Sequence, residues 1–348
     1  MARTCQWCLS VYRNATNSGG ERRPVQRWVA HAEHRGDLTN RYAPVMTSRE
    51  YTTHEGGKRP AGRGLENPSA IAAISLLTDN DPTIVETCRR QILRWGKTVR
   101  PLLIRTAEGV DRRLAHRASE VLRSMDLADW LERARQFAVD LPHEGRMSWS
   151  RLEQGALLIS AFNRRDPVDE AKTSSILDGY AEDLRGRVEG KAPITCARLL
   201  TDDLASRLGY AGSQSSFYDV ANIQFSEVVS LRRGVPVTLT LLYVLVARRA
   251  GLDVTGVSIP DHFLLRVKGS RPVLIDPYHE GRQVTKADCL RYLRNAGYSL
   301  HTTSYLEDVH DRQILDCLLR NLLRVYGYQE DHELCSVLES ARQSLMRN

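Results

Sequence analysis

The chain has 348 residues, of which 42% are hydrophobic and 26% are charged, so it can bury a sizeable core and is not an intrinsically disordered protein as a whole. Its formal net charge is +7, but residues 1–66, with eleven Lys/Arg and six Asp/Glu, account for +5 of it. The remaining residues are nearly neutral, which argues against a nucleic-acid surface on the folded part.

Cysteine usage and hydropathy predict a cytoplasmic protein. The seven cysteines are odd in number and scattered, which favours reduced thiols over a disulfide framework. The longest apolar run, Val235–Ala247, is shorter than the roughly 20 residues that a membrane-spanning helix needs. We identify no signal peptide and expect no membrane contact.

Residues 1–66 are predicted to form a basic disordered tail, because they show no sustained apolar period and end in a Gly-rich linker. Weak nucleic-acid association is expected only through this tail. Cys5 and Cys8 have the spacing of half a zinc site, but no second pair with ligand spacing follows. We therefore expect no metal here.

Residues 67–189 are predicted to form a helical domain. An apolar stripe begins after Pro68, and Asp81-Pro82 supplies the cap and first residue of a second helix. Two successive helix pairs suggest HEAT-like stacking. Further helices are predicted near residues 100–108, 111–124, 127–138, 149–162 and 171–187.

Residues 190–300 have a different pattern, and the fold class that we predict is α+β. A helix that is apolar on every side, Val237–Ala250, belongs at the centre of a core. Two strands follow it, His262–Val267 and Pro272–Asp276. Residues 301–348 are predicted to be C-terminal helices, from Asp311 to Met346 with a break at Gly327.

The two strands bring a histidine and an aspartate together. With a three-residue turn, His262 lies directly opposite Asp276, and with a two-residue turn the two are diagonal neighbours. A carboxylate that holds one imidazole nitrogen fixes the tautomer and leaves the other nitrogen available for chemistry. A plain polar contact across a hairpin is the alternative interpretation.

Residues from about 68 to 330 resemble the SirB-one family, which has a transglutaminase-like core behind a helical N-terminal domain. The resemblance rests on motifs that agree in order and spacing: Leu152-Glu153-Gln154-Gly155-Ala156, Leu177-Asp178, Leu208-Gly209-Tyr210, Asn222, Arg233-Gly234-Val235-Pro236-Val237-Thr238-Leu239 and Pro260-Asp261-His262-Phe263-Leu264. It implies a transglutaminase-like or papain-like core, with a small antiparallel sheet packed on the buried helix.

The resemblance also implies where an active site would lie. The histidine and aspartate of such thiol enzymes match His262 and Asp276. The position of the nucleophilic cysteine, at the N-terminus of the buried helix, falls on Pro236, which has no nucleophile. The chain departs from the family pattern again at Asp261, in place of a glycine, and at His279-Glu280, which interrupts a glycine pair.

Other residues could replace the missing thiol. Thr238 and Thr240 lie further along the same helix, but helix hydroxyls usually bond to a preceding carbonyl. Cys196 and Cys289 are remote in sequence. His262, His279 and Glu280 suggest a metal, yet their spacing is not diagnostic, so we expect no metal and no cofactor.

The sequence thus predicts a non-catalytic protein that binds a peptide or protein partner. The degenerate cleft would be lined by His262, Asp276 and the candidate binding residues Tyr218, Asn222, Arg233 and Asp261. The helical half would carry a protein partner. The rival hypothesis is an active hydrolase or amidase that uses His262 and Asp276 with water or a threonine.

Overall fold

The computed structural model describes residues 67–142, 145–164, 166–213, 219–298 and 305–347. The predicted tail, 1–66, lies outside the described residues, so its disorder stays a prediction. The chain divides into two compact units, residues 1–92 and 93–348. The described part of the first unit holds helix α2 (Pro68–Ser75), the 3₁₀ turn η1 (Leu76–Thr78) and most of α3 (Pro82–Trp95).

The second unit begins with a short 3₁₀ turn and four α-helices: η2 (Gly96–Thr98), α4 (Arg100–Ala107), α5 (Arg112–Val139), α6 (Trp149–Ser160) and α7 (Glu170–Val188). The predicted break between residues 124 and 127 is wrong, because α5 is one helix of 28 residues. No Gly or Pro interrupts it there, and Met125 and Leu127 are both buried in the core.

Short elements then lead to the central helix: α8 (Pro193–Thr201), the π-helical turn η3 (Asp202–Arg207), β1 (Ala211–Gly212), the 3₁₀ turn η4 (Val220–Asn222), α9 (Phe225–Leu231) and β2 (Arg233–Gly234). Strands β1 and β2 pair in parallel, with Gly212 beside Gly234. This pairing places β1 next to the start of the helix that follows β2.

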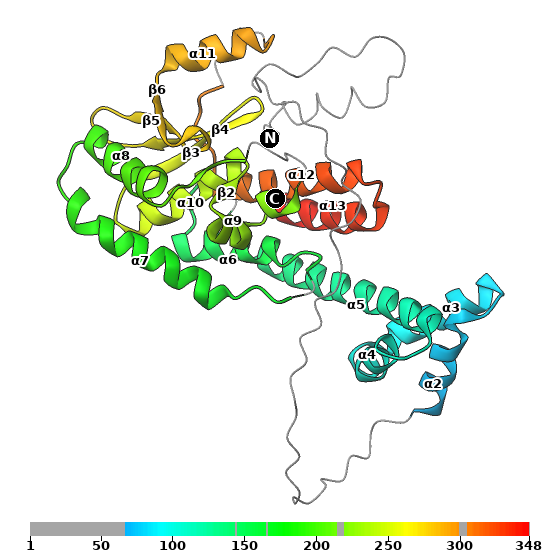
Figure 1. The fold of residues 1–348 in the computed structure, drawn as a ribbon. Coiled ribbons are helices and arrows are strands. Elements are labelled where there is room, and N and C mark those ends of the chain that lie inside the picture. The colour runs from blue at the N-terminus through cyan, green and yellow to red at the C-terminus, as the bar shows by residue number, and fades with distance from the viewer. Residues whose placement is uncertain (1–66, 143–144, 165, 214–218, 299–304, 348) are drawn as a thin grey trace, which may run out of the picture. The chain divides into compact units, whose positions relative to one another are not determined.

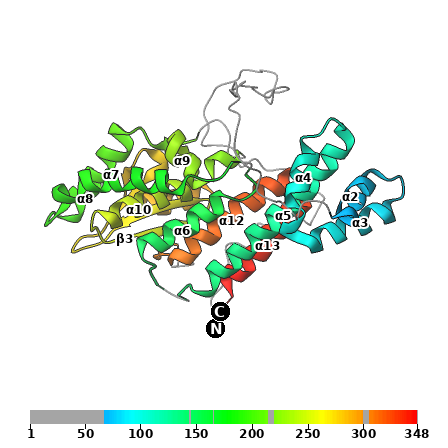
Figure 2. The same cartoon turned by 90° about the horizontal axis from the view of Figure 1, so that it is seen from below.

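Helix α10 (Pro236–Arg249) is the centre of the unit, and each of its residues is buried. The sheet covers one side of it, and α6, α7, α9 and α12 pack on the others (Figure 1, Figure 2). At its C-terminus, Arg248 forms a two-pronged ion pair with the fully buried Asp311, at 2.7 and 2.8 Å. Arg249 pairs with Glu153 at 2.6 Å. The all-round apolar pattern therefore predicted the position of this helix correctly.

The sheet has four antiparallel strands in the order β3-β4-β5-β6: β3 (Val254–Ile259), β4 (His262–Val267), β5 (Val273–Asp276) and β6 (Arg282–Val284). Strands β3 and β6 were not predicted. The predicted turn of two or three residues is too short, because Val267 pairs with Val273 across a five-residue loop. Continuing this register sets Leu264 opposite Asp276, so His262 is a diagonal neighbour.

Three α-helices complete the unit: α11 (Lys286–Asn295), α12 (Asp311–Tyr328) and α13 (His332–Met346). Helix α11, which was not predicted, begins at a capping box between Thr285 and Asp288. The two predicted C-terminal helices are present, and the break between them lies at residues 329–331 rather than at Gly327. The described residues contain no helix long and apolar enough to cross a membrane. The predicted α+β class, with a sheet on a buried helix and helices at both ends, is confirmed.

Candidate functional site

A tight turn presents His262 at the start of β4. Ile259 pairs with His262, so Pro260 and Asp261 form a two-residue connection between β3 and β4. Asp261 has a φ of 53°, in the left-handed region that this turn position requires. The conformation explains why glycine suits this position and why aspartate, which tolerates it better than most residues, can stand there.

A second turn presents Asp276 and His279. Asp276 ends β5 and caps the 3₁₀ turn η5 (Pro277–His279), where its Oδ1 accepts the backbone N–H groups of Tyr278 and His279 at 3.1 and 3.2 Å. In a 3₁₀ helix, side chains three residues apart lie one above the other. The turn therefore places the His279 ring directly over the Asp276 carboxylate.

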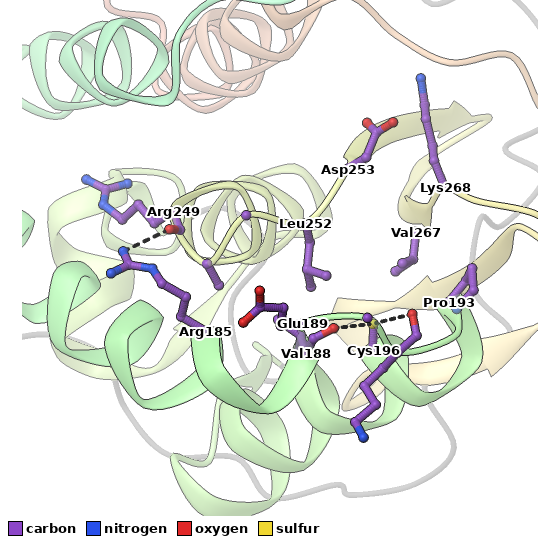
Figure 3. Close-up of a pocket in the computed structure, with 14 residues that line it drawn as sticks. Arg185, Val188, Glu189, Pro193, Cys196, Arg249, Leu252, Asp253, Val267 and Lys268 are labelled. Carbon is purple, nitrogen blue, oxygen red and sulfur yellow. Dashed lines mark hydrogen bonds between the residues drawn. The ribbon is translucent and has the colours of Figure 1, made fainter.

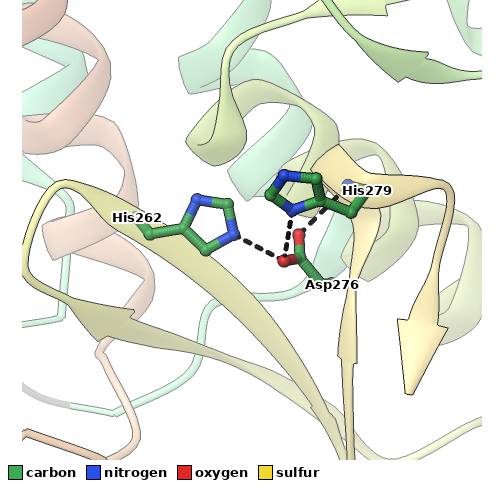
Figure 4. A group of neighbouring side chains, drawn as sticks. All are labelled: His262, Asp276 and His279. Carbon is green, nitrogen blue, oxygen red and sulfur yellow. Dashed lines mark hydrogen bonds and ion pairs between the residues drawn. The ribbon is translucent and has the colours of Figure 1, made fainter. Parts of the chain in front are cut away.

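The three side chains meet at one oxygen atom. His262 Nε2 lies 2.8 Å from Asp276 Oδ2, and His279 Nδ1 lies 2.7 Å from the same atom (Figure 4). The predicted contact between His262 and Asp276 is thus confirmed. His279 is the third member of the cluster, and the sequence pointed to it only as a metal candidate with His262 and Glu280, not as a partner of Asp276.

The charges of this cluster follow from its geometry. Burial opposes ionisation of Asp276, but hydrogen bonds from His262 and His279 outweigh it and hold the pKa of that carboxyl far below its ordinary range. The hydrogen bond to Asp276 raises the pKa of His279, against the effect of partial burial. The site thus holds a firmly ionised carboxylate between two imidazole rings.

Tyr278 fixes η5 against β1. Its hydroxyl donates to the Ser213 carbonyl at 2.8 Å, and its ring lies 5.8 Å from the His262 ring, edge to face. A Cβ atom at Gly212 would approach the Tyr278 ring to 2.6 Å. Glycine is therefore required at this position so that the tyrosine can pack against the β1 backbone.

We expect Gly212→Ala to lower the free energy of unfolding by about 1–3 kcal/mol, because the added methyl overpacks the Tyr278 ring. Urea denaturation measures the change. Gly179→Ala on α7 is the matched control, since nothing lies within 4 Å of its added Cβ. This control should be neutral or up to about 1 kcal/mol more stable. Equal effects of both substitutions would contradict the packing argument.

The N-terminus of α10 lies beside η4 and carries no nucleophile at its first residue, Pro236. The Val235 N–H donates to the Asn222 carbonyl at 2.9 Å, and Thr238 donates to the Ile223 carbonyl at 3.1 Å. The Thr240 hydroxyl donates to the Phe263 carbonyl at 3.3 Å. Both threonine hydroxyls are therefore engaged with backbone carbonyls.

The remaining predicted binding residues differ in their placement. Tyr218 lies outside the described residues. Arg233 donates to the Gly209 carbonyl at 2.6 Å and to the Arg232 carbonyl at 2.8 Å. Asp261 accepts the Tyr298 hydroxyl at 2.7 Å. In the described part of the chain, no hydrogen bond or ion pair joins Arg233 or Asp261 to the His–Asp cluster.

The two cysteines that we considered as substitutes lie in inert surroundings. Cys196 borders a cavity of about 530 Å³ between α7, α8 and the C-terminal end of α10, and its thiol points to the carbonyls of Val188 and Lys191 (Figure 3). Cys289 packs in a small apolar cluster with Leu264. Burial raises the pKa of both thiols, the opposite of what activation needs.

Comparison with known proteins places the site in a family context. Residues 171–320 match the family model described as the Transglutaminase-like superfamily. A UPF0162 protein of Xylella fastidiosa is 32% identical over 180 residues, which cover 49% of this chain and 63% of the relative. A UPF0162 protein of Pseudomonas aeruginosa is 36% identical over 102 residues, 29% of this chain and 37% of the relative.

A eukaryotic relative matches as well. F-box only protein 21 of Mus musculus is 31% identical over 130 residues, which cover 34% of this chain and 20% of that protein. The chain thus spans less than two thirds of the length of these relatives. No solved structure matched it. The matched family segment contains the His262–Asp276–His279 cluster and all of α10.

Proposed function

We propose that this protein is a non-catalytic, SirB-one-like protein of the transglutaminase-like type, which binds a peptide or protein segment at the cluster of His262, Asp276 and His279. The match of residues 171–320 to the superfamily supports the ancestry. The proposal further assigns the protein to the cytoplasm, which five free thiols among the described residues support: Cys88, Cys196, Cys289, Cys317 and Cys335.

One observation carries the non-catalytic part of the proposal. A thiol triad needs a nucleophile at the N-terminus of the central helix, and α10 begins with Pro236. The neighbouring hydroxyls of Thr238 and Thr240 are bonded to carbonyls. The base and its orienting carboxylate are therefore present without a side-chain nucleophile at the N-terminus of α10.

The cluster of His262, Asp276 and His279 can still bind a peptide segment. Asp276 is ionised, and the His279 side chain is about half exposed, so an incoming segment can reach it. With its pKa raised, His279 can offer a positive charge to an acidic side chain of a peptide. One relative of this chain is an F-box only protein, a name that fits a role in protein binding.

Peptide selection tests this proposal. A peptide library panned on the full-length protein should yield ligands whose affinity falls at least about tenfold in His262→Ala and in His279→Ala, as truncation of a binding hot spot does. Fluorescence anisotropy measures the affinity. His116→Ala is the matched control, because that side chain is 74% exposed on α5 and outside the cluster. Ligands whose affinity is the same for the wild type and for all three variants would refute the proposal.

The same geometry favours a second function, hydrolysis or amide cleavage without a thiol. Asp276 holds Nε2 of His262 at 2.8 Å, the arrangement in which a carboxylate orients a general base. Nδ1 would then be the nitrogen that takes a proton from water. The selected peptides distinguish the two functions: time-dependent cleavage or deamidation that disappears in His262→Ala would establish the enzyme.

A further inference from the structure

We propose that His262 Nε2, Asp276 Oδ2 and His279 Nδ1 bind a divalent transition-metal ion of the zinc class. Each of the three residues offers one donor atom, and these atoms all lie within 4.8 Å of one another. Two imidazoles and one carboxylate form a donor set that zinc and related ions prefer. This inference goes beyond the proposed peptide binding and does not depend on it.

The two turns hold the donors in place before any ion arrives. Oδ1 of Asp276 is occupied by two backbone N–H groups, so the carboxylate turns Oδ2 toward both rings. Hydrogen bonds of this kind, from groups behind the ligands, orient the ligands and are part of a functional metal site. His279 follows in the same turn, and His262 begins the neighbouring strand.

The distances leave room for an ion after a small adjustment. Tetrahedral zinc with bonds of about 2.0–2.1 Å separates neighbouring donors by about 3.3 Å. The present separations of 2.8 and 2.7 Å are those of hydrogen bonds, in which protons bridge the atoms. A slight rotation of the Asp276 carboxylate would exchange those protons for the metal.

The surroundings supply an entry path and an open coordination position. His279 is half exposed and borders solvent, whereas the side chains of His262 and Asp276 are 12% and 8% exposed. An ion can therefore enter past His279 and rest against two nearly buried ligands. Three protein ligands leave a fourth tetrahedral position for water or another ligand, as in catalytic zinc sites.

A buried hydroxyl lies on α10, the helix that packs against the turn of the cluster. Tyr243 of α10 is completely buried, and its hydroxyl has no hydrogen-bond partner among the described residues. Helix α10, which carries Tyr243, packs on the turn η5, which holds His279 and which Asp276 caps. A water on the metal is the kind of partner that this hydroxyl lacks.

The sequence suggested His262 and His279 as metal ligands, but together with Glu280 rather than Asp276 and without a diagnostic spacing. Asp276 and His279 are three residues apart, but His262 lies 14 residues before Asp276 and reaches it only through the hairpin. Motif searches recognise metal sites by pairs with short, fixed spacing. The ligand set becomes apparent only when β4 and η5 are placed side by side.

Cobalt(II) binding tests the inference on the full-length protein after dialysis against a chelator. One equivalent of Co²⁺ should bind with a visible d–d spectrum of low-symmetry nitrogen and oxygen coordination, and Zn²⁺ should displace it. His262→Ala and His279→Ala should each weaken binding by at least about 100-fold, because even loss of outer-shell partners costs 10–100-fold. His116→Ala and the double variant Cys5→Ser/Cys8→Ser should bind as the wild type does.

Three results would overturn the inference: no stoichiometric binding by the wild type, binding that survives both cluster substitutions, or binding lost only when Cys5 and Cys8 are replaced. Circular dichroism of each variant verifies folding, and the half-exposed His279 is the substitution least disturbing to the core. Peptide affinity measured with and without chelator separates the two proposals, since either one can fail while the other holds.

Discussion

Pro236→Cys is expected to create a thiol with a pKa below the free value of about 8.5. Residue 236 is the first of α10, where unpaired backbone N–H groups favour a negative charge. Residue 240, one turn later on the same face, bonds to the carbonyl of Phe263, next to His262. The turn η5, which Asp276 caps, also packs on α10. Both the helix terminus and His262 should therefore stabilise the thiolate.

The expected effect is large. A pKa lowered by one to two units raises the thiolate fraction at pH 6 by about 10–100-fold. Ultraviolet thiolate absorbance against pH, as a difference from the wild type, measures the pKa even if the buried thiol is shielded from reagents. In the double variant Pro236→Cys/His262→Ala the thiol pKa should be higher than in Pro236→Cys, because the contribution of His262 is lost. A thiol with an ordinary pKa that does not depend on His262 would show that residue 236 does not face His262 from the N-terminus of α10.

Arg248→Ala is expected to destabilise the protein by about 3–5 kcal/mol. The guanidinium and the Asp311 carboxylate form two hydrogen bonds, and their side chains are 5% and 0% exposed. Asp311 also accepts the Met147 N–H at 2.7 Å. Removing the arginine leaves a carboxylate charge buried with a single weak donor, which is far more costly than losing the attraction itself.

Denaturant unfolding measures this effect, and Arg146→Ala is the matched control. Arg146 also pairs with an aspartate, Asp253, at 2.6 Å, but these side chains are 42% and 60% exposed. Loss of this exposed ion pair should lower the free energy of unfolding by about 0–1 kcal/mol. Arg248→Ala/Asp311→Asn should recover part of the loss, because asparagine keeps an acceptor without the charge. A loss below 1 kcal/mol in Arg248→Ala would contradict the argument.

The sequence predicted correctly those helices whose position is determined by nearby residues. Pro82 and Pro236 both begin helices, where the missing N–H of proline is not needed. The apolar surface around α10 predicted its central position. Helix α11 and strands β3 and β6 were missed, although the capping box at Thr285 and the β-branched residues of β3 are signals that a closer inspection of the sequence could have used.

The site was predicted in part. His262 and Asp276 meet as diagonal neighbours, one of the two predicted arrangements, but across a five-residue loop rather than a two-residue turn. The length of that loop depends on tertiary packing: Gly269 has a φ of 140° and lies against Pro193 of α8. No local pattern encodes this contact, and none encodes the 3₁₀ turn that brings His279 onto the same oxygen.

The pairing of Arg248 with Asp311 also bears on the order in which a newly made chain can complete its core. The two residues are 63 positions apart, and synthesis at about 5–20 residues per second separates their appearance by several seconds. During that interval Arg248 lacks the carboxylate of Asp311. Burying its unpaired charge would be costly, so we expect the C-terminal end of α10 to remain solvated until then. The core around the C-terminal end of α10 therefore cannot be completed until Asp311 has been synthesised.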